Sequence, residues 1–98
     1  MHIYIYNENM RFEWDPEKAK RNLFFHKVSF EEAIESFFDP NAVDDFDEHH
    51  SDQETRYNLI GLSSRRLLFV VYSEPDADIV RIISARKADT KHEKIYGN

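Results

Sequence analysis

Three β-patterned segments lie close together in the C-terminal half of the chain. They cover residues 56–60, 67–72 and 79–84 and are rich in β-branched and aromatic side chains. Turn-forming residues separate them, with Ser63-Ser64 in the first connection and Pro75-Asp76 in the second. Connections this short return the chain beside itself, because parallel neighbours need a crossover of about a dozen residues or more. The chain must therefore fold around an antiparallel meander.

Two helices are predicted before the meander. Asp15 is a favourable N-cap and Pro16 suits the first helical position, so the pair predicts a helix over residues 16–25. Its inner face is expected to carry Ala19 and Leu23, together with Trp14 or His26. The residues that flank this face are Lys18, Arg21 and Asn22.

The second helix is predicted from a capping box with Ser29 as N-cap and Glu32 at the third helical position. It should end before Pro40, because the residue that precedes a proline disfavours helical backbone. Its apolar side chains recur at helical spacing. They are Phe30, Ala33, Ile34, Phe37 and Phe38.

Shorter elements complete the expected fold. Residues 2–6 and 11–14 are candidate strands, and residues 42–46 are a candidate edge strand. A capping box that begins at Thr90 predicts a short C-terminal helix. We therefore expect one α+β domain over residues 1–98, with two N-terminal helices packed on one face of a mostly antiparallel sheet of about four strands.

Composition excludes several kinds of site. The chain has no cysteine, which rules out disulfides, thiolate metal sites and a cysteine nucleophile. Its two glycines cannot form a phosphate-cradling loop. No signal peptide and no apolar run of membrane-spanning length are recognisable. We therefore expect a cytoplasmic protein with no cofactor and no membrane partner.

Charge is divided unevenly along the chain, whose formal net charge is −6. Residues 1–55 contain 5 basic and 14 acidic residues, whereas residues 56–98 contain 8 and 5. Residues 39–54 alone hold seven acids and no Lys or Arg. The overall charge argues against a nucleic-acid partner, but the basic C-terminal half favours a phosphate-rich one, above all RNA.

Glu54 and Arg56 are the first candidate site residues. Side chains two apart on a strand point to the same face, and Asn58 continues this row. The acid can serve as a general base while the guanidinium neutralises a phosphate. The spacing fits equally an ordinary ion pair on a solvated strand.

The end of the last strand carries a second candidate group. Strict alternation places Arg81 on the opposite face from Ser84 and Arg86. An arginine in so apolar a strand needs either a partner, for which Glu54 is a candidate, or a position at the mouth of a cleft. Arg86 and Lys87 lie where the strand gives way to a loop, which suits binding residues but also ordinary surface charge.

His26 and the acidic stretch supply the remaining candidates. Imidazole titrates near neutral pH, so His26 can act as a general acid or base, although the helix dipole alone favours histidine at a helix C-terminus. The acidic stretch has metal-binding residue types but no metal-binding spacing, so we expect a solvated loop and no metal site. Its residues are Asp45, Asp47, Glu48, His49, His50 and Asp52.

The order and spacing of these pieces resemble the BrnT family of toxins over about residues 11–96. The N-terminal part of the resemblance consists of Phe12-Glu13-Trp14-Asp15, Lys18, Asn22, His26 and Val28-Ser29-Phe30-Glu31-Glu32-Ala33. The C-terminal part consists of Glu54-Thr55-Arg56, Ile60-Gly61, Arg81-Ile82-Ile83-Ser84-Ala85-Arg86-Lys87-Ala88, Glu93 and Tyr96. The chain departs from the family at Phe25-His26-Lys27, where Lys-His-Gly is usual.

The resemblance implies a RelE-like fold and a ribonuclease that acts as the toxin of a type II toxin–antitoxin pair. It implies an RNA substrate and an antitoxin with a ribbon-helix-helix part, through which alone DNA is contacted. We expect metal-independent cleavage by the ribose 2′-hydroxyl. The expected catalytic residues are His26, Glu54, Arg56, Arg81, Arg86 and Tyr96, and the expected RNA-binding residues are Lys18, Lys27, Asn58, Ser84 and Lys87.

Within this hypothesis, Glu54 or His26 accepts the 2′-hydroxyl proton and the arginines hold the phosphate. Tyr96 or His26 protonates the leaving oxygen. The alternative is a non-catalytic binding module that regulates transcription together with a DNA-binding partner.

Overall fold

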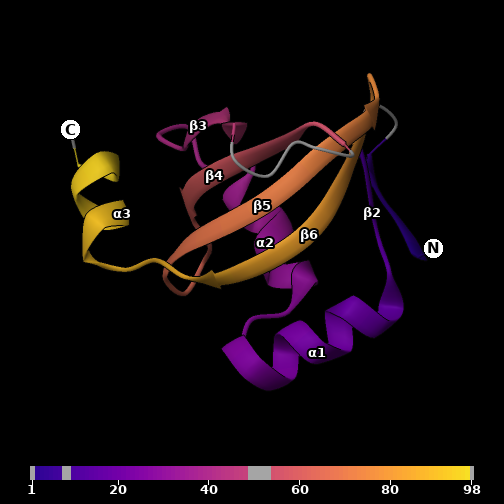
Figure 1. The fold of residues 1–98 in the computed structure, drawn as a ribbon, viewed down its shortest axis with the longest axis horizontal. Coiled ribbons are helices and arrows are strands. Elements are labelled where there is room, and N and C mark those ends of the chain that lie inside the picture. The colour runs from indigo at the N-terminus through magenta and orange to yellow at the C-terminus, as the bar shows by residue number, and fades with distance from the viewer. Residues whose placement is uncertain (1, 8–9, 49–53, 98) are drawn as a thin grey trace.

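The computed structural model describes residues 2–7, 10–48 and 54–97, and only the backbone of residues 2–7. Strands and helices alternate in groups along the chain (Figure 1). The elements in order are β1 (His2–Asn7), β2 (Met10–Trp14), α1 (Pro16–His26), α2 (Phe30–Ser36), β3 (Val43–Phe46), β4 (Arg56–Leu62), β5 (Leu67–Asp76), β6 (Ile79–Lys87) and α3 (Thr90–Tyr96).

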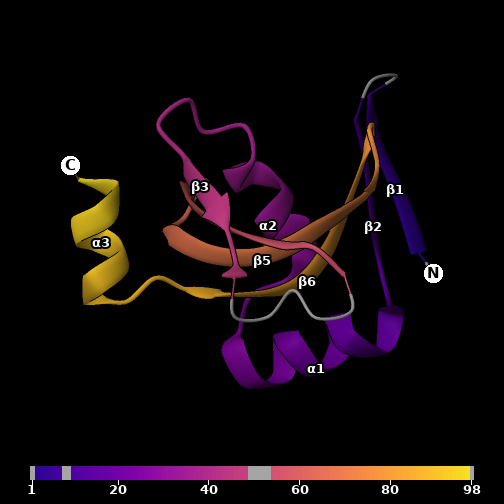
Figure 2. The same cartoon turned by 45° about the horizontal axis from the view of Figure 1, so that its top comes forward.

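The strands form one sheet in the order β1-β2-β6-β5-β4-β3. All neighbouring strands are antiparallel except β2 and β6, which run parallel over Arg11–Glu13 and Ile79–Arg81. The expected α+β class and the edge position of β3 are therefore confirmed. In the described part of the chain the sheet has six strands rather than about four, because the β1–β2 hairpin joins it. Figure 2 shows this hairpin and α3 at opposite ends of the molecule.

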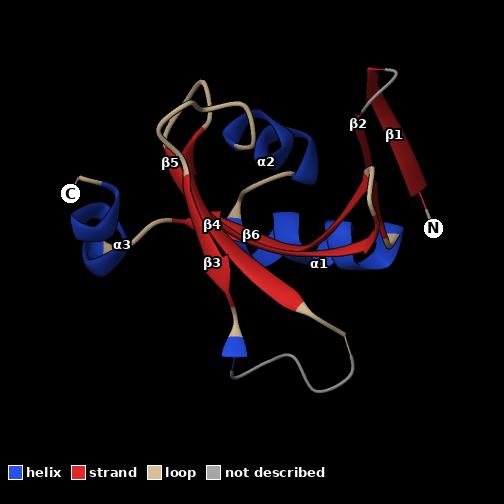
Figure 3. Ribbon diagram, turned by 90° about the horizontal axis from the view of Figure 1, so that it is seen from above, coloured by secondary structure: helices blue, strands red, loops and turns tan. Residues whose placement is uncertain are grey.

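The hydrophobic core lies between the sheet and α2, which contacts β4, β5 and β6 on one face (Figure 3). Trp14 meets Phe30 edge to face, with ring centroids 5.7 Å apart. Gly61 allows the end of α2 to approach β4, since an added Cβ would lie 2.6 Å from the Ser36 carbonyl oxygen. The largest fully buried side chains are Phe12, Phe30, Leu68, Ile82, Val28, Val70 and Ser36.

Helix caps agree with the expected boundaries in two cases of three. The carboxylate of Asp15 accepts from the Glu17 N–H at 2.9 Å, and the hydroxyl of Ser29 accepts from the Glu32 N–H at 3.0 Å. The cap predicted at Thr90 is wrong by one residue, because Asp89 caps α3 and His92 completes its capping box. The last hairpin also turns at residues 77–78, after β5 has continued through Asp76.

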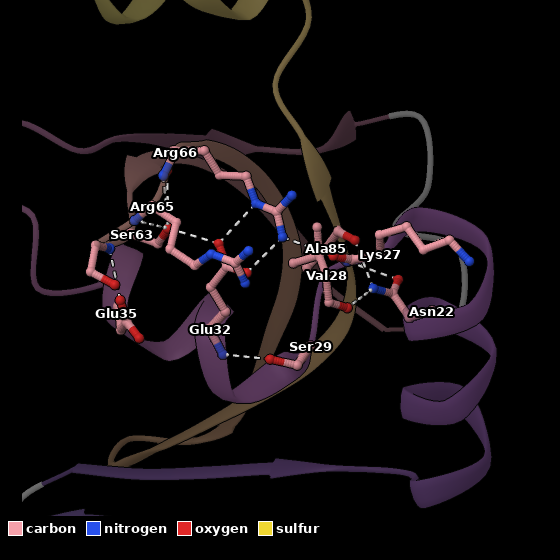
Figure 4. A network of polar contacts seen from close by, with 11 residues as sticks. Asn22, Lys27, Val28, Ser29, Glu32, Glu35, Ser63, Arg65, Arg66 and Ala85 are labelled. Carbon is pink, nitrogen blue, oxygen red and sulfur yellow. Dashed lines mark hydrogen bonds and ion pairs between the residues drawn. The ribbon is translucent and has the colours of Figure 1, made fainter.

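Helix α1 lies along β6, where β2 no longer covers the strand edge. The side chain of Asn22 replaces a neighbouring strand there: its amide donates to the Ala85 carbonyl at 2.7 Å and accepts from the Ala85 N–H at 3.1 Å. It also donates to the Val28 carbonyl at 2.9 Å (Figure 4). The predicted inner face of α1 is confirmed at Ala19, which packs against the core, but is wrong at Leu23, which is 51% exposed, whereas Asn22 is buried.

A second polar network joins the β4–β5 turn to both helices (Figure 4). The guanidinium of Arg66 donates to both carboxylate oxygens of Glu32, at 3.0 and 2.8 Å, and to the Lys27 carbonyl at 2.8 Å. Glu32 also accepts from the Ser63 hydroxyl at 2.8 Å. The guanidinium of Arg66 holds the pKa of Glu32 below its usual value, so the two side chains form an ion pair. Arg66 therefore has a structural role in the fold.

Substituting Asn22→Asp tests the strand-replacing role of the amide. The carboxylate keeps the size and one acceptor but cannot donate to the Val28 and Ala85 carbonyls, so two buried acceptors lose their partner. We expect a loss of about 2–4 kcal/mol in unfolding free energy, measured by urea denaturation. A matched Arg21→Ala change on the exposed side of α1 should alter stability by less than about 0.5 kcal/mol. Equal stability of Asn22→Asp and the original chain would contradict this role.

Candidate active site

The sheet face opposite α2, here called the open face, carries three cross-strand rows of side chains. The first row contains Arg56, Ser73, Arg81 and Glu13. The second contains Asn58, Val71 and Ser84, and the third contains Ile60, Phe69 and Arg86. Residues directly opposite one another on paired strands share a face, so the rows bring all three candidate arginines to one surface.

A β-bulge in β6 makes this possible. Val71 pairs with Ser84 and Tyr72 pairs with Ile82, so Ile83 is an extra residue with no partner opposite it. The extra residue shifts the alternation by one position. Arg81 therefore shares the open face with Ser84 and Arg86, and the predicted placement on opposite faces is wrong.

Arg81 is held between two carboxylates. Its Nε donates to Glu13 Oε2 at 2.6 Å and its Nη1 donates to Glu54 Oε2 at 3.2 Å. Ser73 also donates to Glu54, at 3.4 Å. The expected pairing of Arg81 with Glu54 is thus present, and the carboxylate of Glu13 is the main cause of the raised pKa of Arg81. Glu54 reaches the row from the segment before β4 rather than from the strand.

Beside this cluster lies a hollow of about 420 Å³, here called the arginine hollow. Arg86 borders it with a side chain that is 42% exposed, placed 5.0 Å above the Phe69 ring and 3.9 Å from Asp89. Guanidinium groups above an apolar floor can bind an anion more strongly than they would in open water. The lining residues are Asp47, Arg56, Asn58, Phe69, Val71, Ile83, Ser84 and Arg86.

His92 supports the arginine hollow from α3. Its ring stacks on Phe69 with centroids 4.1 Å apart and planes 10° from parallel. Its Nδ1 accepts from the Asp89 N–H at 3.1 Å, so this nitrogen carries no proton even though the Asp89 carboxylate lies 3.2 Å away. Burial lowers the pKa of His92, in agreement with a neutral ring. The capping pattern, read one residue earlier, would have revealed this residue.

His26 and Lys18 lie together in a separate groove of about 310 Å³, here called the α1 groove. It borders the arginine hollow through Ile83, which lines both. The lining residues are Lys18, Arg21, Asn22, Phe25, His26 and Ile83. The structure therefore brings His26 beside the arginines but not among them.

Three expected site residues lie elsewhere. The Tyr96 hydroxyl donates to Asp39 at 2.7 Å, and this bond raises the pKa of Tyr96. Lys27 donates to the Phe24 carbonyl at 2.8 Å and covers the Phe24 ring, with backbone in the left-handed region at φ 59°. Lys87 pairs with Leu68, whose side chain lies in the core, so Lys87 belongs to the face opposite Arg86.

The acidic stretch is only partly covered by the structure. His49, His50 and Asp52 lie outside the described residues. Among the residues that are described, no three His, Asp or Glu side chains gather as a metal site would require. No helix in the described part of the chain is long and apolar enough to cross a membrane.

The fold and the arginine hollow define a small α+β protein with an arginine-lined hollow on one sheet face. Residues 14–92 match the family described as the ribonuclease toxin, BrnT, of type II toxin–antitoxin systems, so the chain belongs to this family. A crystal structure of the Brucella abortus ribonuclease toxin BrnT is similar, with a TM-score of 0.56 and 19% identity over 81% of this chain and 96% of that chain. At this identity the similarity shows the shared fold. The comparison with curated proteins found no match.

The protonation of His92 provides a pH test of the site. A histidine whose pKa is lowered on folding stabilises the fold fully above its unfolded value, near 6.5, and loses this contribution as the pH falls. We expect unfolding free energy to fall between pH 7 and pH 5 more steeply in the original chain than in His92→Asn, whose amide oxygen can still accept from Asp89. Parallel pH profiles from urea denaturation would contradict this assignment.

Proposed function

We propose that this chain is a toxin that cleaves RNA by attack of a ribose 2′-hydroxyl on the adjacent phosphate. The observation that carries the proposal is the arginine hollow, which Arg56 and Arg86 both line. Glu54 is bonded to Arg81, in the cross-strand row that contains Arg56. RNA supplies its own nucleophile, so the protein has to provide a base, an acid and charge stabilisation but no metal ion.

Arg56 and Arg86 hold the scissile phosphate in this mechanism. Asn58 and Ser84 line the same hollow and contact the ribose or the phosphate oxygens. A guanidinium fork matches phosphate oxygens, and its charge offsets the negative charge that develops in the transition state. Phe69 keeps one side of the hollow apolar, which strengthens these electrostatic contacts.

Glu54 accepts the proton of the 2′-hydroxyl. Its Oε2 is bonded to Arg81 and Ser73, and we assign Oε1 to the substrate, since no described residue bonds to it. Arg81 is therefore a positioning residue for Glu54 instead of a phosphate ligand. The 2′-oxygen bonds to phosphorus as the bond to the 5′-oxygen breaks, and His26 returns a proton to the leaving 5′-oxygen. The products are a 2′,3′-cyclic phosphate and a 5′-hydroxyl.

Family membership implies an antitoxin partner. We propose that this antitoxin has a ribbon-helix-helix part, neutralises the toxin and alone contacts DNA. The chain then stops translation by cutting RNA in the cytoplasm whenever antitoxin is lacking.

The carboxylates near the arginines favour one alternative function. Glu13 and Glu54 occupy Arg81, and Asp47 lines the arginine hollow, so an anionic ligand has to compete with the protein's own acids. A non-catalytic module that binds an antitoxin through this face would tolerate such competition. RNA cleavage by the purified chain separates the two functions.

The chemistry of the products tests the mechanism. We expect purified protein to cut single-stranded RNA equally in EDTA and in Mg²⁺, leaving 2′,3′-cyclic phosphate and 5′-hydroxyl ends detectable by mass spectrometry. An RNA with 2′-deoxyribose on the 5′ side of the cut should resist, because the nucleophile is missing. Ends with a 5′-phosphate, or activity abolished by EDTA, would contradict the mechanism.

Single substitutions test the assigned roles. Arg56→Ala and Arg86→Ala should each lower kcat/KM by about 10²–10³-fold, since each removes a charge from the transition state. Glu54→Gln should lower kcat by about 10²–10⁴-fold with little change in KM. Arg65→Ala is the matched control, because Arg65 is exposed at the β4–β5 turn, and it should retain full activity. A fully active Arg86→Ala variant would disprove the role of the hollow.

A further inference from the structure

The α1 groove has the composition of a binding site for a single-stranded nucleic acid. Lys18, Arg21 and His26 supply its polar side chains together with Asn22, and none of the described residues that line it is acidic. Phe25 and Ile83 supply its apolar surface. Proteins that bind single strands combine a basic groove that follows the phosphates with aromatic rings that stack on the bases.

Phe25 is unusually accessible for a phenylalanine. It is 70% exposed, although burial of such a ring would be favourable. Its neighbour Phe24 is 68% exposed and meets it edge to face, with ring centroids 5.0 Å apart and planes at 85°. Lys27 in turn covers Phe24, with Nζ 5.1 Å from the ring centroid. These contacts hold Phe25 against Phe24 and leave Phe25 beside the basic groove.

The α1 groove adjoins the arginine hollow. Ile83, the extra residue of the β6 bulge, lines both concavities. Figures 1 and 2 show α1 running beside β6. A chain bound across Arg56 and Arg86 therefore reaches Phe25 by passing over Ile83.

We propose that the α1 groove binds the nucleotide on the 3′ side of the cleaved bond. Phe25 stacks on its base, and Lys18 and Arg21 bind its phosphate. The groove is assigned to the 3′ nucleotide on the basis of the proposed function, on which this inference rests. The 5′-oxygen that His26 protonates belongs to that nucleotide. Phe25 thereby acts in substrate affinity and in the preference for the base that follows the cut.

Binding of an uncleavable RNA tests this groove apart from the chemistry. A fluorescein-labelled, single-stranded RNA with 2′-O-methyl ribose throughout keeps its bases and phosphates but has no nucleophile. Phe25→Ala should weaken its binding about tenfold or more, as measured by fluorescence anisotropy, because one stacked base is lost. Phe25→Trp should restore binding. Leu23→Ala is the matched control, because Leu23 is 51% exposed on the same helix but does not line the groove, and it should change affinity less than twofold. Phe24→Ala, which removes only the ring that contacts Phe25, should weaken binding less than Phe25→Ala.

A scan with abasic nucleotides locates the stacked base. One abasic position should weaken binding to the original chain but cause no further loss with Phe25→Ala, because both changes remove the same contact. Arg21→Ala should lower the salt dependence of binding by about 0.7 in the log–log slope, the share of one phosphate on a single strand.

The outcomes separate this inference from the proposed function. If unmodified RNA is not cleaved but Phe25→Ala still weakens binding selectively, the proposed chemistry fails and the groove stands. If Phe25→Ala and Phe24→Ala both bind the 2′-O-methyl RNA like the original chain, the proposed binding of RNA by the α1 groove is overturned. Loss of antitoxin binding in both variants, with RNA affinity unchanged, would assign the two rings to the antitoxin instead.

Discussion

The amide of Asn22 is the contact on which the arrangement of the site depends. Strand β2 accompanies β6 only as far as Arg81, and beyond that point the backbone of β6 would present an unpaired edge. Asn22 satisfies both the N–H and the carbonyl of Ala85, and so holds α1 where a further strand would otherwise lie. A helix in this position brings basic and aromatic side chains to the border of the open face, which another strand would have closed.

The distribution of charge explains how an acidic chain can carry an arginine-lined surface. Two of its arginines are committed to carboxylates: Arg66 to Glu32 within the fold, and Arg81 to Glu13 and Glu54 at the edge of the hollow. Such pairs contribute modestly to stability because desolvation offsets most of the attraction, but they fix the positions of their members. Arg81 thereby fixes the orientation of Glu54, which precedes β4, beside the arginine hollow.

Local signals in the sequence predicted much of the fold. Asp15, Ser29 and the short turns of the meander act through nearest neighbours, so helix starts and antiparallel pairing could be read directly. The geometry of the site depends on two features that no local sequence pattern indicates. The bulge at Ile83 is a property of strand pairing, and it reversed the face predicted for Arg81. Asn22 looked like a flanking polar residue, because its partner Ala85 lies 63 positions away.

The bulge and the left-handed residue after α1 act together on the shape of the site. Ile83 turns one apolar side chain toward the border between the arginine hollow and the α1 groove, so that the two concavities meet. Lys27 ends α1 with φ at 59°, a conformation that costs a non-glycine residue about 1–2 kcal/mol. Glycine at this position would avoid this strain but could not cover Phe24. Lys27 therefore has a strained backbone, but its side chain contacts Phe24 and so supports the exposed pair Phe24 and Phe25. Backbone strain that maintains an exposed aromatic pair is expected where the ring, here Phe25, serves binding rather than stability.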